Sequence, residues 1–225
     1  MIVFVMNAGP LDLSEIKASG VPIIAAGYSG EQGGRALAEV IIGSYNPGGA
    51  TTTTWLPEEY TKLASFQDLN MRPRSETGYP GRTYRFLNET AVMPLWRFGY
   101  GLSYTSFKID IVQNPSGPLS PGESSTWTVQ VSNIGKTIGG VVVVCYVAAI
   151  RQQEVTLPPV RSSFGFARIE GLLPGTHELL SFPLTSEARS LVGDNGARLN
   201  PHGQYGVECE AGGVAKTKKM VFEIA

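Results

Sequence analysis

Two short runs of consecutive apolar residues constrain how the first fifty residues fold. Residues 2–6 and 21–26 are apolar throughout, and a glycine-containing turn follows each run. A strand without polar alternation must be covered on both faces, which is typical of a parallel sheet. Helical periodicity at about 12–19 and 31–42, the latter placing Leu37, Val40 and Ile41 on one face, completes a predicted order of strand, helix, strand, helix.

Two strands and two helices do not cover both faces of a parallel sheet. Because the chain opens inside the first apolar run, we expect the remaining strands to lie upstream, in polypeptide outside this sequence. The first part of the chain is therefore predicted to be a partial α/β/α sandwich with a parallel sheet.

After about residue 105 the pattern changes to the period of two that is typical of half-buried strands. Trp127, Val129 and Val131 alternate with polar residues. Further strands are predicted at residues 141–149, 166–169, 179–184, 204–210 and 218–224. About seven short strands separated by turns indicate an immunoglobulin-like β-sandwich. The predicted fold class is α/β plus all-β.

Residues 46–104 follow neither period and are rich in Gly, Pro, Arg and aromatic residues. Irregular stretches of this length are usually functional segments or linkers. The aromatic content favours an ordered segment in which Tyr84, Phe86, Phe98 and Tyr100 are substantially buried against the flanking domains. The predicted division is 1–56 for the α/β/α part, 57–104 for an aromatic-rich interdomain segment and 105–225 for the β-sandwich.

The net charge and the length of the apolar runs argue against two classes of partner, nucleic acid and the membrane interior. Eighteen Lys and Arg face 19 Asp and Glu, for a net charge of -1, so no basic field for nucleic acid is expected. The longest apolar run, residues 141–150, is well short of the roughly 20 residues of a membrane span. No signal peptide is recognised at the start of this chain.

Several residues are candidates for chemical roles by their type and spacing. The turn Gly27–Gly34 before a helix is able to bind phosphate, but its spacing departs from the dinucleotide motif, which favours close packing instead. Paired carboxylates for glycoside hydrolysis have candidates by residue type alone, and surface or capping roles are the default for them: Asp12, Glu15, Glu31, Glu58, Glu59, Asp68 and Glu76. We expect no self-sufficient active site, no metal site and no cofactor.

Three further positions have specific expectations. Strand alternation points Cys145 and Cys209 into the sandwich. Whether they form a disulfide stays open, because bridging requires Cα atoms within about 7 Å. Asn88-Glu89-Thr90 is an N-glycosylation sequon.

Four motifs together resemble the C-terminal half of glycoside hydrolase family 3. In chain order they are Gly27–Ala38, Asn46–Gly49, Tyr79–Phe86 and Phe98–Thr105. Asn70-Met71-Arg72-Pro73 looks most like the β-xylosidase branch. Residues 105–225 resemble the family's fibronectin type III-like domain, with Gly165-Phe166, Leu173-Pro174-Gly175 and residues 201–205 at matching places.

The resemblance implies an enzyme with a (β/α)8-type barrel carrying an Asp nucleophile, then an α/β/α sandwich that commonly supplies the acid/base Glu. Both positions would lie outside this chain, so no catalytic residue is assigned. The resemblance implies that the loop Gly30, Glu31, Gln32, Gly33 and Gly34 lies toward the substrate cleft. It also implies that Tyr79, Arg82, Tyr84 and Arg85 belong to a segment between domains.

Two functions follow as hypotheses. The chain is the C-terminal portion of a secreted β-xylosidase or β-glucosidase, which meets its carbohydrate substrate through the missing barrel and is not catalytic without it. Alternatively, it is a non-catalytic structural or interaction subunit that binds other protein subunits. By resemblance, its location is extracellular or in the secretory pathway.

Overall fold

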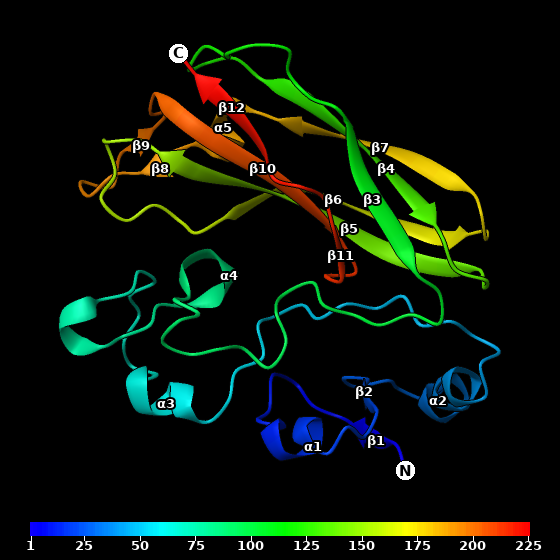
Figure 1. The fold of residues 1–225 in the computed structure, drawn as a ribbon. Helices are drawn as coiled ribbons and strands as arrows, with labels where there is room; N and C mark the ends of the chain where they lie inside the picture. The colour runs from blue at the N-terminus through cyan, green and yellow to red at the C-terminus, as the bar shows by residue number, and fades with distance from the viewer. The chain divides into compact units, whose positions relative to one another are not determined.

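A computed structural model describes all 225 residues, and its contacts divide the chain into two units. Residues 1–46 and 51–100 form the N-terminal unit, and residues 47–50 and 101–225 form the C-terminal unit. The chain therefore passes from one unit to the other three times (Figure 1). The structure groups residues 51–100 with the first forty-six residues, whereas the sequence suggested a separate segment.

The N-terminal unit begins with two parallel strands, β1 (Val3–Val5) and β2 (Ile23–Ala25). Helix α1 (Ser14–Ala18) connects them, and α2 (Gly33–Ile41) follows β2. The predicted order of strand, helix, strand, helix is confirmed. The elements are shorter than the apolar runs, because β1 and β2 pair over only three residues each.

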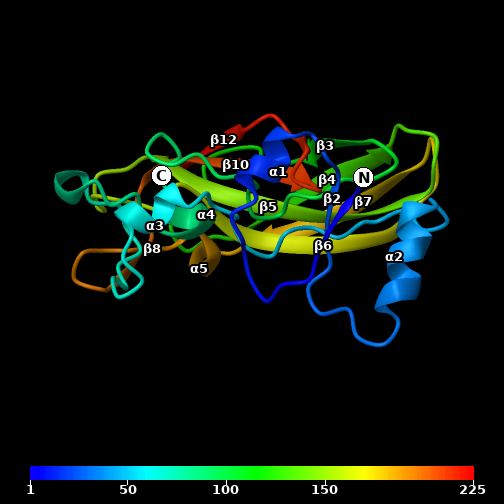
Figure 2. The same cartoon turned by 90° about the horizontal axis from the view of Figure 1, so that it is seen from below.

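Helix α2, the blue helix in Figure 2, has no buried residue. Leu37 and Val40 are half-buried, whereas Ile41 is 47% exposed and the following Ile42 is 75% exposed. The apolar face that the sequence predicts is therefore present but largely uncovered.

Residues 51–100 contain three short helical elements within irregular chain. These are α3 (Glu59–Leu63), η1 (Ser75–Thr77) and α4 (Thr83–Phe86). Tyr84, Phe86, Phe98 and Tyr100 are only half-buried, which is less than predicted. The rings of Tyr84 and Phe98 stack with their centroids 4.7 Å apart, so the segment is ordered through its own contacts.

The C-terminal unit is mostly β, with two antiparallel sheets and a small hairpin. Its strands are β3 (Phe107–Gln113), β4 (Ser125–Asn133), β5 (Gly139–Arg151), β6 (Ser162–Leu172), β7 (His177–Leu184), β8 (Leu191–Val192), β9 (Arg198–Leu199), β10 (Gly203–Ala211), β11 (Ala215–Lys216) and β12 (Met220–Ile224). The order β3-β4-β7 forms a three-stranded sheet. The order β11-β10-β5-β6, with β12 also paired to β10, forms a five-stranded sheet. The hairpin is β8-β9, and α5 (Ser186–Arg189) is the one helix.

One hydrophobic core joins the two sheets. Alternate residues of β4 (Trp127, Val129 and Val131) are fully buried in it, as the alternation predicts. Facing residues of β5 and β10, including Val143 and Val207, complete the core. Trp127 and Phe222 of β12 meet edge to face with their ring centroids 5.6 Å apart. Burial of such large apolar side chains stabilises this unit by about 1.5 to 3 kcal/mol for each.

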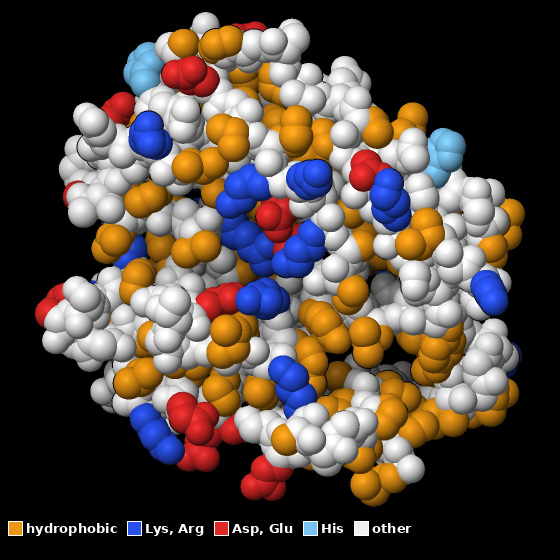
Figure 3. Space-filling view, viewed as in Figure 1, with side chains coloured by type: hydrophobic (Ala, Val, Ile, Leu, Met, Phe, Trp, Pro, Cys, Tyr) orange, Lys and Arg blue, Asp and Glu red, His pale blue; other side chains and the backbone are white.

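Charges on the surface are mixed in sign. Acidic and basic side chains lie next to one another on the face shown in Figure 3, with hydrophobic side chains scattered between them. This agrees with the near-zero net charge. None of the helices combines the length and the apolar character that crossing a membrane requires.

Candidate functional site

The turns after β1 and β2 lie at the same edge of the parallel pair. The amide of Ala26 donates to the carbonyl of Val5 at 3.0 Å, which extends the pairing to the ends of both strands. The chain then turns at Asn7–Pro10 after β1 and at Gly27–Gly30 after β2. In open parallel sheets ligands bind at this carboxyl edge, so these turns are the candidate functional site of the N-terminal unit.

The glycine-rich loop leads from β2 into α2. Gly30 has a positive φ of 68°, and its carbonyl accepts a hydrogen bond from the amide of Gly33 at 3.1 Å. Glu31 and Gln32 are exposed at the tip of the loop, and Gln32 is the N-cap of α2. The loop therefore presents a carboxylate and an amide beside a helix N-terminus. These groups are suited to hydrogen bonding with hydroxyl groups.

The Tyr79–Phe86 segment is organised around a buried tyrosine. Tyr79 is 3% exposed and its hydroxyl donates to the carbonyl of Asn70. The guanidinium groups of Arg74 and Arg82 lie 4.9 and 5.9 Å from its ring centroid. Arg82 also donates to the carbonyl oxygens of Ser65 and Asp68, both at 2.7 Å. Arginine thus holds two loops together through backbone acceptors.

The turn after Tyr79 requires glycine. Gly81 has a φ of 83°, and a Cβ atom there would lie 2.4 Å from the carbonyl oxygen of Phe86. Tyr60, from α3, donates its hydroxyl to the Gly81 carbonyl at 3.1 Å. Burial raises the pKa of Tyr60, which keeps this hydroxyl protonated as a donor. Arg85, by contrast, is exposed and lies against the ring of Phe86.

Two of the candidate carboxylates support loops. Asp12 accepts hydrogen bonds from the Ser14 hydroxyl and amide and from the Glu58 amide, and these bonds lower its pKa. Asp68 accepts from the amide and side chain of Asn70, which lower its pKa, and it also pairs with Arg74. A carboxyl group with a lowered pKa is a poor general acid near neutral pH. Both residues therefore have structural roles.

The sequon lies in an exposed turn. Asn88 is exposed, and its side-chain oxygen accepts hydrogen bonds from the hydroxyl of Thr90 at 2.6 Å and from the amide of Thr90 at 3.1 Å. In a sequon that is glycosylated, the glycan is attached to the side-chain nitrogen of the asparagine.

The two cysteines are fully buried on facing strands. Cys145 of β5 and Cys209 of β10 are direct partners in the sheet register, and the structure joins them in a disulfide. Both have 0% exposure within the core, so the predicted inward placement is confirmed. The bridge links residues 64 positions apart in the sequence.

Sequence reasoning missed three polar groups that are central to the C-terminal unit. Asn133, 1% exposed, donates to the Thr137 and Leu172 carbonyls and accepts from Thr105 and Gly135. It lies at the end of β4, where a glycine two positions on was the only available signal of a turn.

Arg189 and Glu210 are the other two missed groups. Arg189, 2% exposed, donates to the carbonyls of Ser120, Pro121 and Glu123. Glu210, 3% exposed, pairs with Arg161 and Lys216, each at 2.7 Å. Nothing in the local sequence distinguishes these two residues from surface charges.

The sequence and the structure of the chain were compared with those of known proteins. Residues 1–104 match the glycosyl hydrolase family 3 C-terminal domain. The exo-1,4-beta-xylosidase xlnD of Emericella nidulans is 30% identical over 223 residues, which are 91% of this chain and 27% of that protein. Residues 1–104 belong to the glycosyl hydrolase family 3 C-terminal domain, and the similarity to the xylosidase extends over most of the chain.

Other family 3 relatives agree. Probable beta-D-xylosidase 6 of Arabidopsis thaliana is 46% identical over 117 residues, 51% of this chain and 14% of that protein. A solved GH3 exo-beta-xylosidase (XlnD) in complex with a xylobiose aziridine activity-based probe matches with a TM-score of 0.82 and 28% identity, over 100% of this chain and 30% of that chain. This chain thus spans less than a third of the length of each of these proteins.

Proposed function

We propose that this chain takes part in the hydrolysis of O-glycosyl bonds, with a separate barrel portion carrying the reacting groups. The observation that carries the proposal is that this chain matches only part of two longer proteins. It covers 27% of the length of an exo-1,4-beta-xylosidase and 14% of the length of a probable beta-D-xylosidase. Glycoside hydrolysis needs two carboxyl groups on opposite sides of one bond. Asp12 and Asp68 support loops and have lowered pKa values, so neither suits the role of general acid, and in this proposal both reacting carboxyl groups belong to the barrel portion.

In this proposal the loop Gly30–Gly34 lines the substrate cleft. Support comes from its place at the carboxyl edge of β1 and β2 and from the exposed side chains of Glu31 and Gln32. These side chains hydrogen-bond sugar hydroxyls and so position the carbohydrate for the barrel portion. They take no part in bond cleavage.

We further propose that the N-terminal unit is part of an α/β/α sandwich and that the C-terminal unit is fibronectin type III-like. The parallel pairing of β1 and β2 supports the first assignment. The shared core of a three-stranded and a five-stranded antiparallel sheet supports the second. The segment with Tyr79, Arg82, Tyr84 and Arg85 then runs between domains of the whole enzyme.

The test is hydrolysis of 4-nitrophenyl xyloside and glucoside by the chain, with and without the N-terminal portion of a family 3 β-xylosidase. We expect turnover only from the copurified pair. Gln32→Ala should raise the KM of the pair, whereas Glu15→Gln, an exposed change in α1, should not. Turnover by the chain alone, or an inert pair that copurifies in a stable complex, would overturn the proposal.

A second candidate function is a non-catalytic structural or interaction subunit. The self-contained core of the C-terminal unit favours it, because such a unit is able to serve as a module by itself. Mass spectrometry of the proteins that copurify with the chain separates the two functions. A family 3 barrel portion supports the hydrolase, and unrelated subunits without a barrel support the alternative.

We also propose that the chain folds in the secretory pathway and is extracellular. The buried disulfide supports this location, since such bonds form and persist in oxidising compartments. The exposed sequon at Asn88 supports glycosylation there. No membrane span is part of this proposal.

Glycosylation is tested by expressing the full chain with a signal peptide in a eukaryotic secreting cell. We expect a mass shift that peptide N-glycosidase removes, leaving Asp at position 88. Thr90→Ala should abolish the shift and Thr90→Ser should retain it. An unmodified secreted chain, beside a control glycoprotein that is modified, would contradict this assignment.

A further inference from the structure

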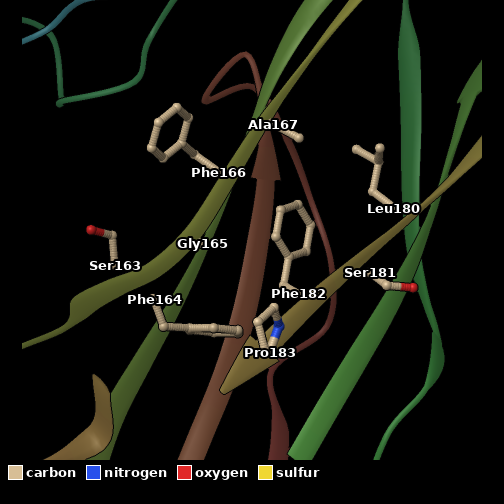
Figure 4. A pocket seen from close by; sticks show the side chains of 9 residues that line it. All are labelled: Ser163, Phe164, Gly165, Phe166, Ala167, Leu180, Ser181, Phe182 and Pro183. Carbon is tan, nitrogen blue, oxygen red and sulfur yellow. The ribbon is translucent and has the colours of Figure 1, made fainter. Parts of the chain in front are cut away.

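Two features of the C-terminal unit differ in the chemistry that their side chains carry. The groove between β6 and β7 is lined by residues 163–167 and 180–183, which offer aromatic, aliphatic and serine side chains and no acid, base or amide (Figure 4). The turn between β8 and β9, by contrast, contains Asn195-Gly196, the one asparagine of the chain that a glycine follows. Both residues of this pair are exposed. The turn therefore combines a side-chain amide with a backbone nitrogen that no neighbouring Cβ atom shields.

A hydrogen bond holds the Asn195 side chain against the backbone that follows it. Its oxygen Oδ1 accepts from the amide of Ala197 at 3.0 Å. An asparagine that bonds the amide two residues on closes a small ring, and this ring includes its own Cγ and the peptide group of Gly196. Oδ1 is also the atom that gains negative charge when a nucleophile attacks Cγ. A donor already placed at that oxygen stabilises the charge.

The backbone at Gly196 is open to reaction. Gly196 has a φ of 82°, and no further atom lies within 4 Å of the position that a Cβ atom would take. Its amide donates to the carbonyl of Gly193 at 2.9 Å, and this bond must break before the nitrogen reacts. β8 and β9 have two residues each, and short exposed hairpins open locally at a low free energy. Local opening therefore releases the nitrogen without unfolding the core.

We propose that Asn195 is a self-modification site, which loses its side-chain amide through a cyclic imide. The Gly196 nitrogen bonds to Cγ of Asn195, and the bond from Cγ to the side-chain nitrogen breaks. The proton of the Gly196 amide leaves with that nitrogen as ammonia. Water then adds to one carbonyl carbon of the imide, and the bond from that carbon to the Gly196 nitrogen breaks. Addition at Cγ gives aspartate, and addition at the main-chain carbonyl gives isoaspartate. Water is the co-reactant, and nothing is oxidised or reduced.

Asn88 provides a comparison within the same chain. It is exposed, and its Oδ1 accepts from the amide of Thr90 at 3.1 Å, which is the same spacing of two residues. The residue that follows it is Glu89, whose carboxylate pairs with Arg97 and whose Cβ atom crowds the peptide nitrogen. The hydrogen bond is shared and the following residue differs, so Asn195 should react and Asn88 should not.

Isoaspartate adds a methylene group to the main chain of the turn. In the hairpin the Gly193 amide donates to the Ala197 carbonyl at 2.9 Å. Asp194 accepts from the Thr156 hydroxyl at 3.1 Å, which ties the turn to the loop after β5. A lengthened turn does not keep both bonds. The isoaspartate form should therefore have an opened β8-β9 hairpin, whereas the aspartate form has an unaltered main chain.

The experiment is incubation of the full, unglycosylated chain at neutral pH in water enriched in heavy oxygen, followed by peptide mapping with mass spectrometry. Heavy oxygen distinguishes conversion during incubation from conversion during digestion. We expect the peptide with Asn195 to lose ammonia and gain a heavy oxygen atom, and isoaspartyl methyltransferase to label it. The peptide with Asn88 should stay unchanged. Hydrogen exchange should rise at residues 191–199 in the isoaspartate form.

Four variants separate the steps. Asn195→Gln should abolish the label, because its longer side chain must close a larger ring. Asn195→Asp carries the new charge without the added methylene, so it should leave hydrogen exchange at residues 191–199 unchanged. Glu89→Gly should create a second reactive site at Asn88. Its matched control, Glu89→Ala, also removes the ion pair but keeps a Cβ atom, and it should create none.

A synthetic peptide of residues 191–199 sets the length of the incubation, which continues until the peptide has converted. Three results would overturn the proposal: an intact Asn195 amide in the chain at that time, equal conversion of Asn88 and Asn195, or a label that Asn195→Gln leaves in place. A Glu89→Gly variant without a second site would contradict the role given to the following residue. The incubation contains no carbohydrate and no barrel portion, so failure of the proposed hydrolase leaves this result independent.

Discussion

The two units of the chain are held together in different ways. The C-terminal unit clusters nineteen buried residues in one core, whereas the buried core cluster of the N-terminal unit contains three, Val5, Leu13 and Trp55. In the N-terminal unit, hydrogen bonds from arginine and tyrosine side chains to backbone carbonyls, such as those of Arg82 and Tyr79, hold loops together. The C-terminal unit therefore has a core of its own, whereas the N-terminal unit leaves apolar surface such as Ile41 and Ile42 of the α2 region uncovered.

The largest expected effect is loss of the disulfide from the C-terminal unit. For a bridge across 64 positions, the chain-entropy model gives about 4 kcal/mol. We expect the Cys145→Ala, Cys209→Ala double variant to lose this much free energy of unfolding. Urea unfolding followed by Trp127 fluorescence, with Trp55 and Trp96 changed to Phe, measures it. An unchanged midpoint would show that the core does not depend on the bridge.

A second comparison pairs two arginines with similar partners and different burial. Arg189 and Arg82 both donate to backbone carbonyls, but Arg189 is 2% exposed and Arg82 is only half-buried. Arg189→Met should lower stability by about 3 kcal/mol, since it removes three charge-assisted hydrogen bonds that a buried side chain donates to backbone carbonyls. Arg82→Met should lose about 1 kcal/mol or less, because water replaces the lost donors. If urea titrations show that both variants lose the same free energy of unfolding, the distinction between the two units is wrong.

Alkaline pH should weaken the C-terminal unit selectively. Burial raises the pKa of Tyr205 to about 12. The unfolded tyrosine ionises near pH 10, so its contribution is fully present below that pH and is lost as pH rises toward 12. The loss is roughly 2 to 3 kcal/mol. Tyr205→Phe should flatten the dependence of the unfolding midpoint between pH 10 and 12, and a persistent slope would assign it to another group.

Acid should weaken the N-terminal unit, with the smallest effect. Hydrogen bonds from Ser14 and Asn70 lower the pKa values of Asp12 and Asp68. A lowered folded-state pKa contributes stability above about pH 4, and this is lost as pH falls through the folded value. Fluorescence of Trp55 and Trp96 should report the loss, and Asp12→Asn should reduce its pH dependence. The Trp127 signal should not follow the same titration.

Much of the fold was predictable because periodicity reports burial directly. Alternation at Trp127, Val129 and Val131 located β4, and unbroken apolar runs located β1 and β2. β3 was missed because Ile109 is its only buried residue. β8, β9 and β11 were missed because each has two residues, and a strand of two residues shows no period. The aromatic content of residues 46–104, by contrast, overstated the burial of Tyr84 and Phe98, whose rings stack on each other.

The candidate site was less predictable, because polar roles depend on long-range partners. The glycine-rich loop was recognisable from its spacing and motif. The support that Arg82 gives to the Ser65 and Asp68 carbonyls, by contrast, spans 17 and 14 positions. Arg189 reaches Ser120 across 69 positions. No local pattern marks such residues, so their roles emerge only from the folded chain.

Hydrogen exchange followed by mass spectrometry tests most directly whether one unit is self-contained and the other needs a further portion of the enzyme. In the chain alone, amides of β4, β5 and β10 should exchange slowly, and those of β1, β2 and α2 should exchange rapidly. Adding the N-terminal portion of a family 3 β-xylosidase should slow exchange in β1, β2 and α2 and leave the sheets unchanged. Equal protection of both units in the chain alone, with no change on addition, would contradict the account.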